Sequence, residues 1–160
     1  MKIRIVTVSS RAPQWIQQGY DEYARRLPRD IALELIEVKP EPRKAGSPGV
    51  KETQQRKNAE ASRIRPVLAG FEAVVALDEK GVYHTTMDLA ELLKSWQRDA
   101  KDAAFIIGGA DGLSDELKRS AHVRMSLSAM TLPHQLVRVM LAEQLYRTAS
   151  ILDNHPYHRA

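Results

Sequence analysis

The chain of 160 residues has the length of one domain and can bury roughly two thirds of the surface that its unfolded form exposes. It has no cysteine, which excludes disulfides, thiolate metal sites and cysteine nucleophiles, and its net charge of +4 is only mildly basic. No segment is apolar over the length that spans a bilayer, and residues 1–15 lack the continuous apolar stretch of a signal peptide. We therefore expect a cytoplasmic protein with no membrane partner.

The first half of the chain predicts two strands and two helices. Residues 2–8 alternate basic or polar side chains with isoleucine and predict a strand, and residues 13–27 follow a helical period that begins at a proline. Residues 31–38 predict a second strand. The stretch 39–49 is rich in proline and glycine and predicts a loop, and residues 50–69 predict a polar helix.

Positive charge concentrates between Lys39 and Arg65. This stretch holds eight basic residues against three acidic ones, and such an excess could dock a polyanion. A solvated helix face beside a loop is the alternative explanation. The basic residues are Lys39, Arg43, Lys44, Lys51, Arg56, Lys57, Arg63 and Arg65.

The middle of the chain continues the alternation of strands and helices. Residues 72–78 are almost wholly apolar and predict a buried strand that ends at Asp78, with a turn at Gly81. Residues 86–98 predict an amphipathic helix. Residues 103–112 predict a strand that leads directly into glycines.

The last part of the chain predicts two further helices around one strand. Ser114 is placed to cap a short helix at 115–120, and residues 123–130 predict a strand. A long helix follows over residues 133–152. Strands that alternate with helices, and that become apolar on both faces, predict a single α/β domain over 1–160 with a mostly parallel sheet covered by helices on both faces.

Three points in this fold are candidate binding positions, because ligands of open α/β sheets bind outside the carboxyl ends of the strands. They are residues 77–78, 108–109 and 127–132. The glycines at 108, 109 and 112 have neither the spacing of a dinucleotide-binding motif nor the lysine of a phosphate-binding loop. A nucleoside-like ligand against the backbone fits better, which disfavours a nicotinamide-dependent reductase. Alternatively, Gly108 and Gly109 only make a tight turn.

The long helix carries apolar residues around much of its circumference, so we expect its own sheet to bury one side and a second subunit to cover another. Arg138 lies among these apolar residues. A buried arginine needs a partner, so Arg138 either pairs internally, for example with Glu143, or faces a site. His134 is expected to cap or pack. No His, Asp and Glu set has metal-ligand spacing, and we expect no metal.

Three motifs in order carry a family resemblance: GGADGLS at 108–114, SLSAMTLPHQLVRVMLAEQLYR at 126–147 and NHPYHR at 154–159. With these motifs the chain resembles the RlmH family of SPOUT methyltransferases from its first strand to its last residues. The resemblance implies a SPOUT-type α/β knot, a homodimer and S-adenosylmethionine as methyl donor. It further implies that N3 of a pseudouridine in large-subunit ribosomal RNA is methylated on the assembled bacterial ribosome.

The resemblance also implies which residues line the methyl donor. They are small or apolar, as expected where backbone groups and apolar contacts hold a neutral purine. These cofactor-binding candidates are Leu77, Gly108, Gly109, Leu127, Ser128, Ala129, Met130, Thr131 and Leu132.

The tail at residues 155–159 supplies the catalytic candidates. Transfer to an imide nitrogen requires a proton to leave and charge on the neighbouring carbonyl oxygens to be stabilised. His155 and His158 are the preferred proton acceptors, ahead of Tyr157, which could instead stack on the target base. Arg138 or Arg159 would hold a phosphate or a carbonyl. The alternatives are a tail docked only for dimer stability and a non-catalytic RNA-binding module of the same fold.

Overall fold

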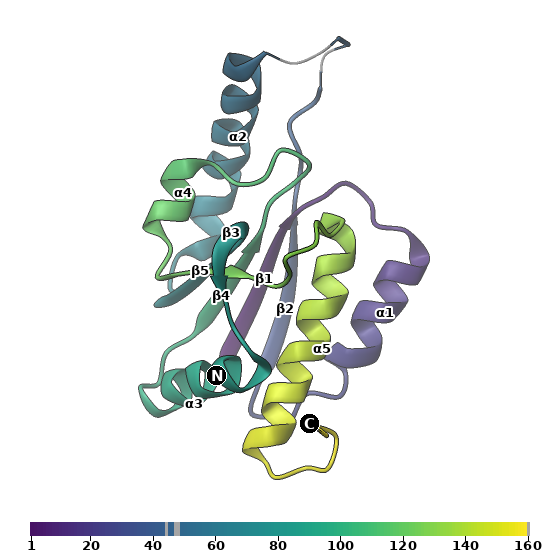
Figure 1. The fold of residues 1–160 in the computed structure, drawn as a ribbon, viewed down its shortest axis with the longest axis vertical. Coiled ribbons are helices and arrows are strands. Elements are labelled where there is room, and N and C mark those ends of the chain that lie inside the picture. Colours follow the sequence, from purple (N-terminus) through teal and green to yellow (C-terminus); the bar gives the residue numbers. More distant parts are fainter. Residues whose placement is uncertain (44, 47–48, 160) are drawn as a thin grey trace.

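The computed structural model describes residues 1–160 except Lys44, Ser47, Pro48 and Ala160, so Lys44 of the basic stretch lies outside the described residues. Strands and helices alternate along the chain (Figure 1). The elements are β1 (Lys2–Val8), α1 (Gln14–Ala24), β2 (Ala32–Val38), α2 (Val50–Ile64), a 3-10 turn η1 (Arg65–Leu68), β3 (Ala73–Tyr83), α3 (Thr86–Arg98), β4 (Ala103–Ile107), α4 (Asp115–Ser120), β5 (Val123–Ser126) and α5 (His134–Leu152).

The five strands form one sheet in the order β2-β1-β4-β3-β5, and every pair of neighbours is parallel. Ile5 of β1 lies between Leu35 of β2 and Phe105 of β4, the central strand of the sheet. The predicted parallel sheet is therefore confirmed. All carboxyl ends of the strands lie along one edge, where the candidate positions were expected.

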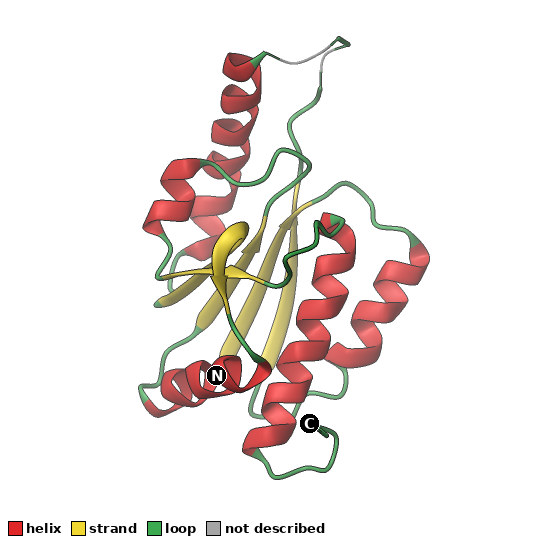
Figure 2. Ribbon diagram, viewed as in Figure 1, coloured by secondary structure: helices red, strands yellow, loops and turns green. Residues whose placement is uncertain are grey.

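Helices cover both faces of this sheet (Figure 2). On one face α1, α3 and α5 pack together, and on the other face α2 and α4 cover a smaller core. Alternate residues of β1 divide between the two cores, with Ile3 and Ile5 on one side and Val6 and Val8 on the other. This burial on both faces explains why β4 is continuously apolar. The knot implied by the family resemblance stays a prediction.

The predicted strand at 123–130 is too long, because β5 ends at Ser126. The Ser126 hydroxyl donates to the carbonyl oxygen of Ser128 at 3.0 Å, and the Met130 backbone N–H donates to the Ser128 hydroxyl at 2.9 Å. Serine side chains that bond nearby backbone compete with a strand ladder. Residues 127–132 therefore form a loop and not a continuation of the strand.

The predicted end of the third strand at Asp78 is also wrong, since β3 continues to Tyr83. Leu77 and Val82 both lie opposite Met125 of β5, so residues 78–81 bulge out of the ladder between them. Gly81 permits this bulge, because a Cβ there would lie 2.7 Å from the carbonyl carbon of Met125. The bulge carries its side chains out along the carboxyl edge of the sheet.

Two predicted helices are shorter than expected, and three match, among them α4, which spans Asp115–Ser120 as predicted. The helix predicted at 13–27 is observed as α1, which ends at Ala24, and the helix predicted at 50–69 ends at Ile64 before η1. Pro66 lies in the first turn of η1 and lacks the N–H that an α-helix would use. The prediction for α3 is confirmed to the residue, and α5 begins one residue later than predicted.

Candidate functional site

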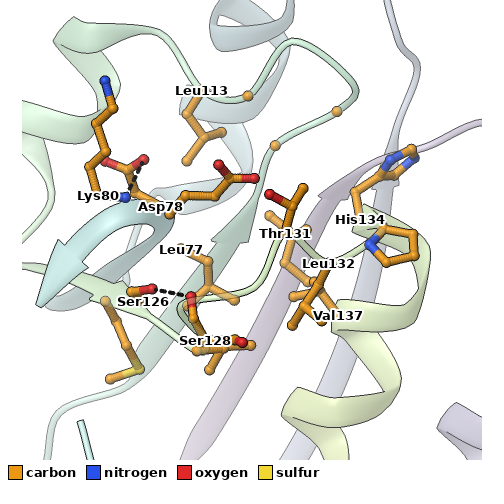
Figure 3. A pocket seen from close by; sticks show the side chains of 18 of the residues that line it. Leu77, Asp78, Lys80, Leu113, Ser126, Ser128, Thr131, Leu132, His134 and Val137 are labelled. Carbon is orange, nitrogen blue, oxygen red and sulfur yellow. Dashed lines mark hydrogen bonds between the residues drawn. The ribbon is translucent and has the colours of Figure 1, made fainter. Parts of the chain in front are cut away.

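A cavity of about 530 Å³ lies at the carboxyl edge of the sheet (Figure 3). Most of its lining comes from three separate stretches: residues 77–80 at the β3 bulge, the turn after β4 at 107–113 and the segment 125–134 that leads into α5. The sequence placed its three candidate positions in these stretches, and the structure confirms that they meet at one site. A volume of this size is typical of sites for small molecules and cofactors.

Eight of the nine cofactor-binding candidates line this cavity, and Ala129 does not. Leu77, Thr131 and Leu132 surround its apolar part in Figure 3. The eight lining residues are Leu77, Gly108, Gly109, Leu127, Ser128, Met130, Thr131 and Leu132.

The glycine turn, residues 108–112, forms one wall by folding back on itself. The Gly112 N–H donates to the Gly109 carbonyl oxygen at 3.0 Å, and Gly112 has a positive φ of 78°. A Cβ on Gly108 would lie 2.7 Å from the carbonyl carbon of Gly112 and 2.8 Å from the Leu113 nitrogen. The tight-turn interpretation of Gly108 is therefore correct. The same turn presents backbone to the cavity, so the two interpretations of the glycines are compatible.

Charged residues also line the cavity, and of these the sequence analysis included only Asp78 among its candidate binding positions. Asp78 in the bulge accepts a hydrogen bond from Arg124 at 2.6 Å and lies 3.7 Å from the Lys118 ammonium. Burial alone would raise the pKa of Asp78, but hydrogen bonds from Arg124 and the Lys80 N–H, with the charge of Lys118, outweigh it and lower that pKa. The sequence signal for Asp78 was its position at the end of a predicted buried strand, whereas no sequence signal pointed to Lys118.

His134 at the start of α5 lines the cavity, although it was expected only to cap or pack. Burial lowers its pKa, and the positive charge of Arg138 one turn further on lowers it again. Both effects favour the neutral form of the imidazole. Figure 3 places it beside Leu132 and Val137 at the rim of the site.

Arg138 itself is fully buried and does not line the cavity. Its Nη2 atom lies 3.4 Å from the Glu37 carboxylate of β2, and its Nε and Nη1 atoms have no partner among the described residues. The suggested pairing with Glu143 is wrong, because Glu143 pairs with Arg147 at 2.6 Å. Of the two alternatives for Arg138, the internal ion pair is the one that this contact favours.

The tail is held against α5 by Tyr157. The Tyr157 hydroxyl donates to Glu143 Oε1 at 3.0 Å, the Arg147 guanidinium lies 4.7 Å from the centre of its ring, and the Tyr146 ring packs against it at 4.5 Å. Arg147 also lies 3.4 Å from Nδ1 of His158. Tyr157 and His158 are half-buried by these contacts, so the tail has a defined place on the helix.

His155 and Arg159 remain exposed beside this anchor. Asn154 adopts a positive φ of 54°, and the His155 N–H donates to the Ser150 carbonyl oxygen at 2.8 Å, which closes the end of α5. The imidazole of His155 therefore projects from a fixed backbone and faces solvent.

The tail and the cavity lie at opposite ends of α5 (Figure 1). The helix has 19 residues, which at 1.5 Å per residue span about 28 Å. Thus the catalytic candidates His155, Tyr157 and His158 do not reach the cavity of their own chain.

The described residues contain no cluster of three metal-ligating side chains. None of the helices in the same residues has the length and apolar character to cross a bilayer.

Comparison with known proteins defines the class. The family model described as "Predicted SPOUT methyltransferase" matches residues 1–158. A probable methylase family protein from Haemophilus influenzae has a similar fold, with a TM-score of 0.63 at 12% identity over 99% of this chain and 70% of that one. A probable methyltransferase from Bordetella pertussis has a TM-score of 0.60 at 15% identity, over 92% and 95% of the two chains. The chain is thus a SPOUT methyltransferase.

Curated relatives narrow this class. A protein of Nitrosomonas eutropha is 49% identical over the full length of both chains, and one of Burkholderia thailandensis is 51% identical, also over both full lengths. Both are named "Ribosomal RNA large subunit methyltransferase H". The chain belongs to this family, RlmH, as its three motifs suggested.

Proposed function

We propose that the chain transfers a methyl group from S-adenosylmethionine to N3 of a pseudouridine in large-subunit ribosomal RNA, on the assembled ribosome. The observation that carries the proposal is the cavity, because three stretches far apart in the sequence, two of them carrying family motifs, converge there. The names of the full-length relatives supply the target class.

The residues present fit the methyl donor. The glycine turn and the loop 127–132 offer backbone groups and small or apolar side chains, which suit a neutral purine, and the cavity has the volume of a cofactor site. S-adenosylmethionine would supply an electrophilic methyl group. The residues of this chain would bind and orient it, and the half-buried apolar wall formed by Leu77 and Leu132 would exclude water from one side.

The distance between tail and cavity supports a homodimer with shared sites. If the tail is catalytic, the tail of one subunit must complete the cavity of its partner. Apolar side chains at the cavity end of α5 are only partly covered within one chain, and Met130 in the adjoining loop is 70% exposed. A second subunit would bury this surface. The partly covered residues are Leu136, Val137, Val139 and Met140.

Within such a site the tail residues take different roles. Tyr157 is committed to Glu143 and Arg147, so it anchors the tail and is a poor candidate for stacking on a base. His155 is exposed and is our first candidate for accepting the imide proton, followed by His158. Arg159 is exposed and can meet a phosphate or a carbonyl oxygen.

Docking to ribosomal RNA would use part of the basic stretch. Among the described residues, Arg43 and Arg56 pair with Asp111, whereas Arg63 and Arg65 pair with the acidic residues Glu41 and Glu116. The lysines of the stretch that the structure describes have no ion pair with a described residue. They are Lys39, Lys51 and Lys57, and we assign phosphate contacts to them.

The proposal is tested by methyl transfer from labelled S-adenosylmethionine to assembled ribosomes and to free ribosomal RNA. The full-length chain should label ribosomes, and a chain truncated after Asn154 should bind the donor with normal affinity but transfer no label. Donor binding without any transfer by the full-length chain would favour the non-catalytic RNA-binding module. Normal labelling by the truncated chain would leave the tail a purely structural role.

Sharing of the sites is tested by mixing two defective chains. One lacks the residues after Asn154, and the other carries Leu132→Arg, which places a charge in the cavity. Random exchange should restore about a quarter of the sites, because half of the dimers are mixed and one of their two sites is intact. If each site were built from one chain, the mixture would stay inactive.

A further inference from the structure

The carboxylate of Asp111 in the glycine turn is held by two arginines from outside the turn. Arg56 of α2 donates from Nε to Oδ2 at 3.0 Å, and Arg43 donates from Nη2 to Oδ1 at 2.8 Å. Both oxygens are therefore bound, and each has its own cation. The sequence analysis counted these arginines only as charge for docking a polyanion.

The two arginines differ in burial. The Arg56 side chain is 9% exposed and the Asp111 side chain 15%, whereas Arg43 is 55% exposed. Arg56 also donates to the Thr53 hydroxyl at 3.2 Å, on a helix whose Ala61 belongs to the core of that face. An exposed ion pair contributes little, but a largely buried one fixes geometry and is costly to break. Arg56 is thus the stronger support of the turn.

A second carboxyl group lies beside the same turn. Glu60, one helical turn further along α2, is 6% exposed, and its Oε2 atom would lie 3.6 Å from a Cβ on Gly109. It therefore packs directly beneath the glycine turn. Burial raises the pKa of Glu60, and the negative charge of Asp111 raises it further. Without Arg56, two carboxyl groups would crowd the same turn with no buried cation between the turn and α2.

We propose that Arg56 is a positioning residue that acts through Asp111 to hold the glycine turn in the shape that receives the methyl donor. The inference rests on the proposed function, since it assigns the turn to S-adenosylmethionine. It gives α2 a role inside the cofactor site. The exposed Arg43 shares the carboxylate but is dispensable for this purpose.

The test compares donor binding among arginine variants of the full chain. In Arg56→Gln the affinity for S-adenosylmethionine, measured by calorimetry, should fall about tenfold, as expected for one lost charged hydrogen bond. The KM for the donor should rise in parallel, while the KM for ribosomes and the kcat at saturating donor stay within about twofold. Arg56→Lys should restore part of the affinity.

Matched controls separate positioning from general stability. Arg43→Gln removes the exposed partner of the same carboxylate, and Arg63→Gln removes another α2 arginine that binds Glu41 and the Lys39 carbonyl oxygen. Both should keep the donor affinity within about twofold. Since Arg56 acts through Asp111, Arg56→Gln should add little to the loss caused by Asp111→Asn.

The outcomes distinguish this inference from the proposed function. Normal donor affinity in Arg56→Gln, or a loss fully additive with that of Asp111→Asn, would overturn the positioning role and leave the proposed function standing. A wild-type chain that binds no S-adenosylmethionine would overturn both.

Discussion

Gly108 is the residue where the smallest change should damage the cavity most. In Gly108→Ala the new methyl group would lie 2.7 to 3.0 Å from three backbone atoms of Gly112 and Leu113, while ordinary contact begins at 3.4 Å. The closest of these atoms must move by about 0.7 Å, and because all three are backbone, no side-chain rotation can relieve the clash. Overpacking of this kind costs about 1–3 kcal/mol of the free energy of unfolding.

The assay combines thermal unfolding with binding of S-adenosylmethionine. For a domain of this size the melting temperature should fall by roughly 2–4 °C for each kcal/mol lost from the free energy of unfolding. The affinity for S-adenosylmethionine should fall further in Gly108→Ala than in the control variant. Gly70→Ala is that control: it meets nothing within 4 Å, and its positive φ of 85° imposes only local strain of about 1–2 kcal/mol. If Gly108→Ala kept both the melting temperature and the donor affinity of the wild type, the close approach of the turn would be refuted.

Two further predictions concern ion pairs. Arg124→Gln removes a hydrogen bond that lowers the pKa of Asp78. The wild type should therefore have the larger free energy of unfolding at pH 7. This difference should vanish as the pH falls below about 4, because Asp78 then becomes protonated. Urea unfolding of both proteins between pH 7 and pH 3 measures this difference in the free energy of unfolding. A difference that stays constant over that range would contradict the reasoning. Glu37→Gln should lower the free energy of unfolding by about 2 kcal/mol, because it leaves the buried charge of Arg138 uncompensated. Arg138→Met should lower it by less than Glu37→Gln does, because the Glu37 carboxylate that it leaves behind reaches solvent. If urea unfolding showed Arg138→Met to be the less stable variant, this explanation would be excluded.

Local patterns predicted most of the fold. The period of apolar residues located all five strands, and the amphipathic pattern at 86–98 gave the bounds of α3, because burial against the sheet imposes these spacings. The rule for carboxyl ends of parallel strands brought Leu77, Gly108 and Leu132 to one cavity. These inferences succeeded because each depends on a single element or on strand direction.

The errors arose where contacts join distant residues. Arg138 pairs with Glu37, which is 101 positions away, whereas the nearer Glu143 is occupied by Arg147 and Tyr157. Likewise, the bulge that extends β3 beyond Asp78 depends on how that strand meets β5. Hydrophobic period carries no information about such partners. The tail residues were recognised from a motif, but their separation from the cavity depends on the course of α5.

The order of the strands also affects how the chain can fold during synthesis. The first strand to leave the ribosome, β1, lies inside the sheet, second from one edge, and one of its two neighbours is β4 at residues 103–107. Pairing with β2 can begin early, but the other edge of β1 stays open until about two thirds of the chain has been made. Contacts across such long stretches form slowly, and open apolar edges attract other chains. Aggregation should therefore be a greater hazard for the nascent chain than for the finished enzyme.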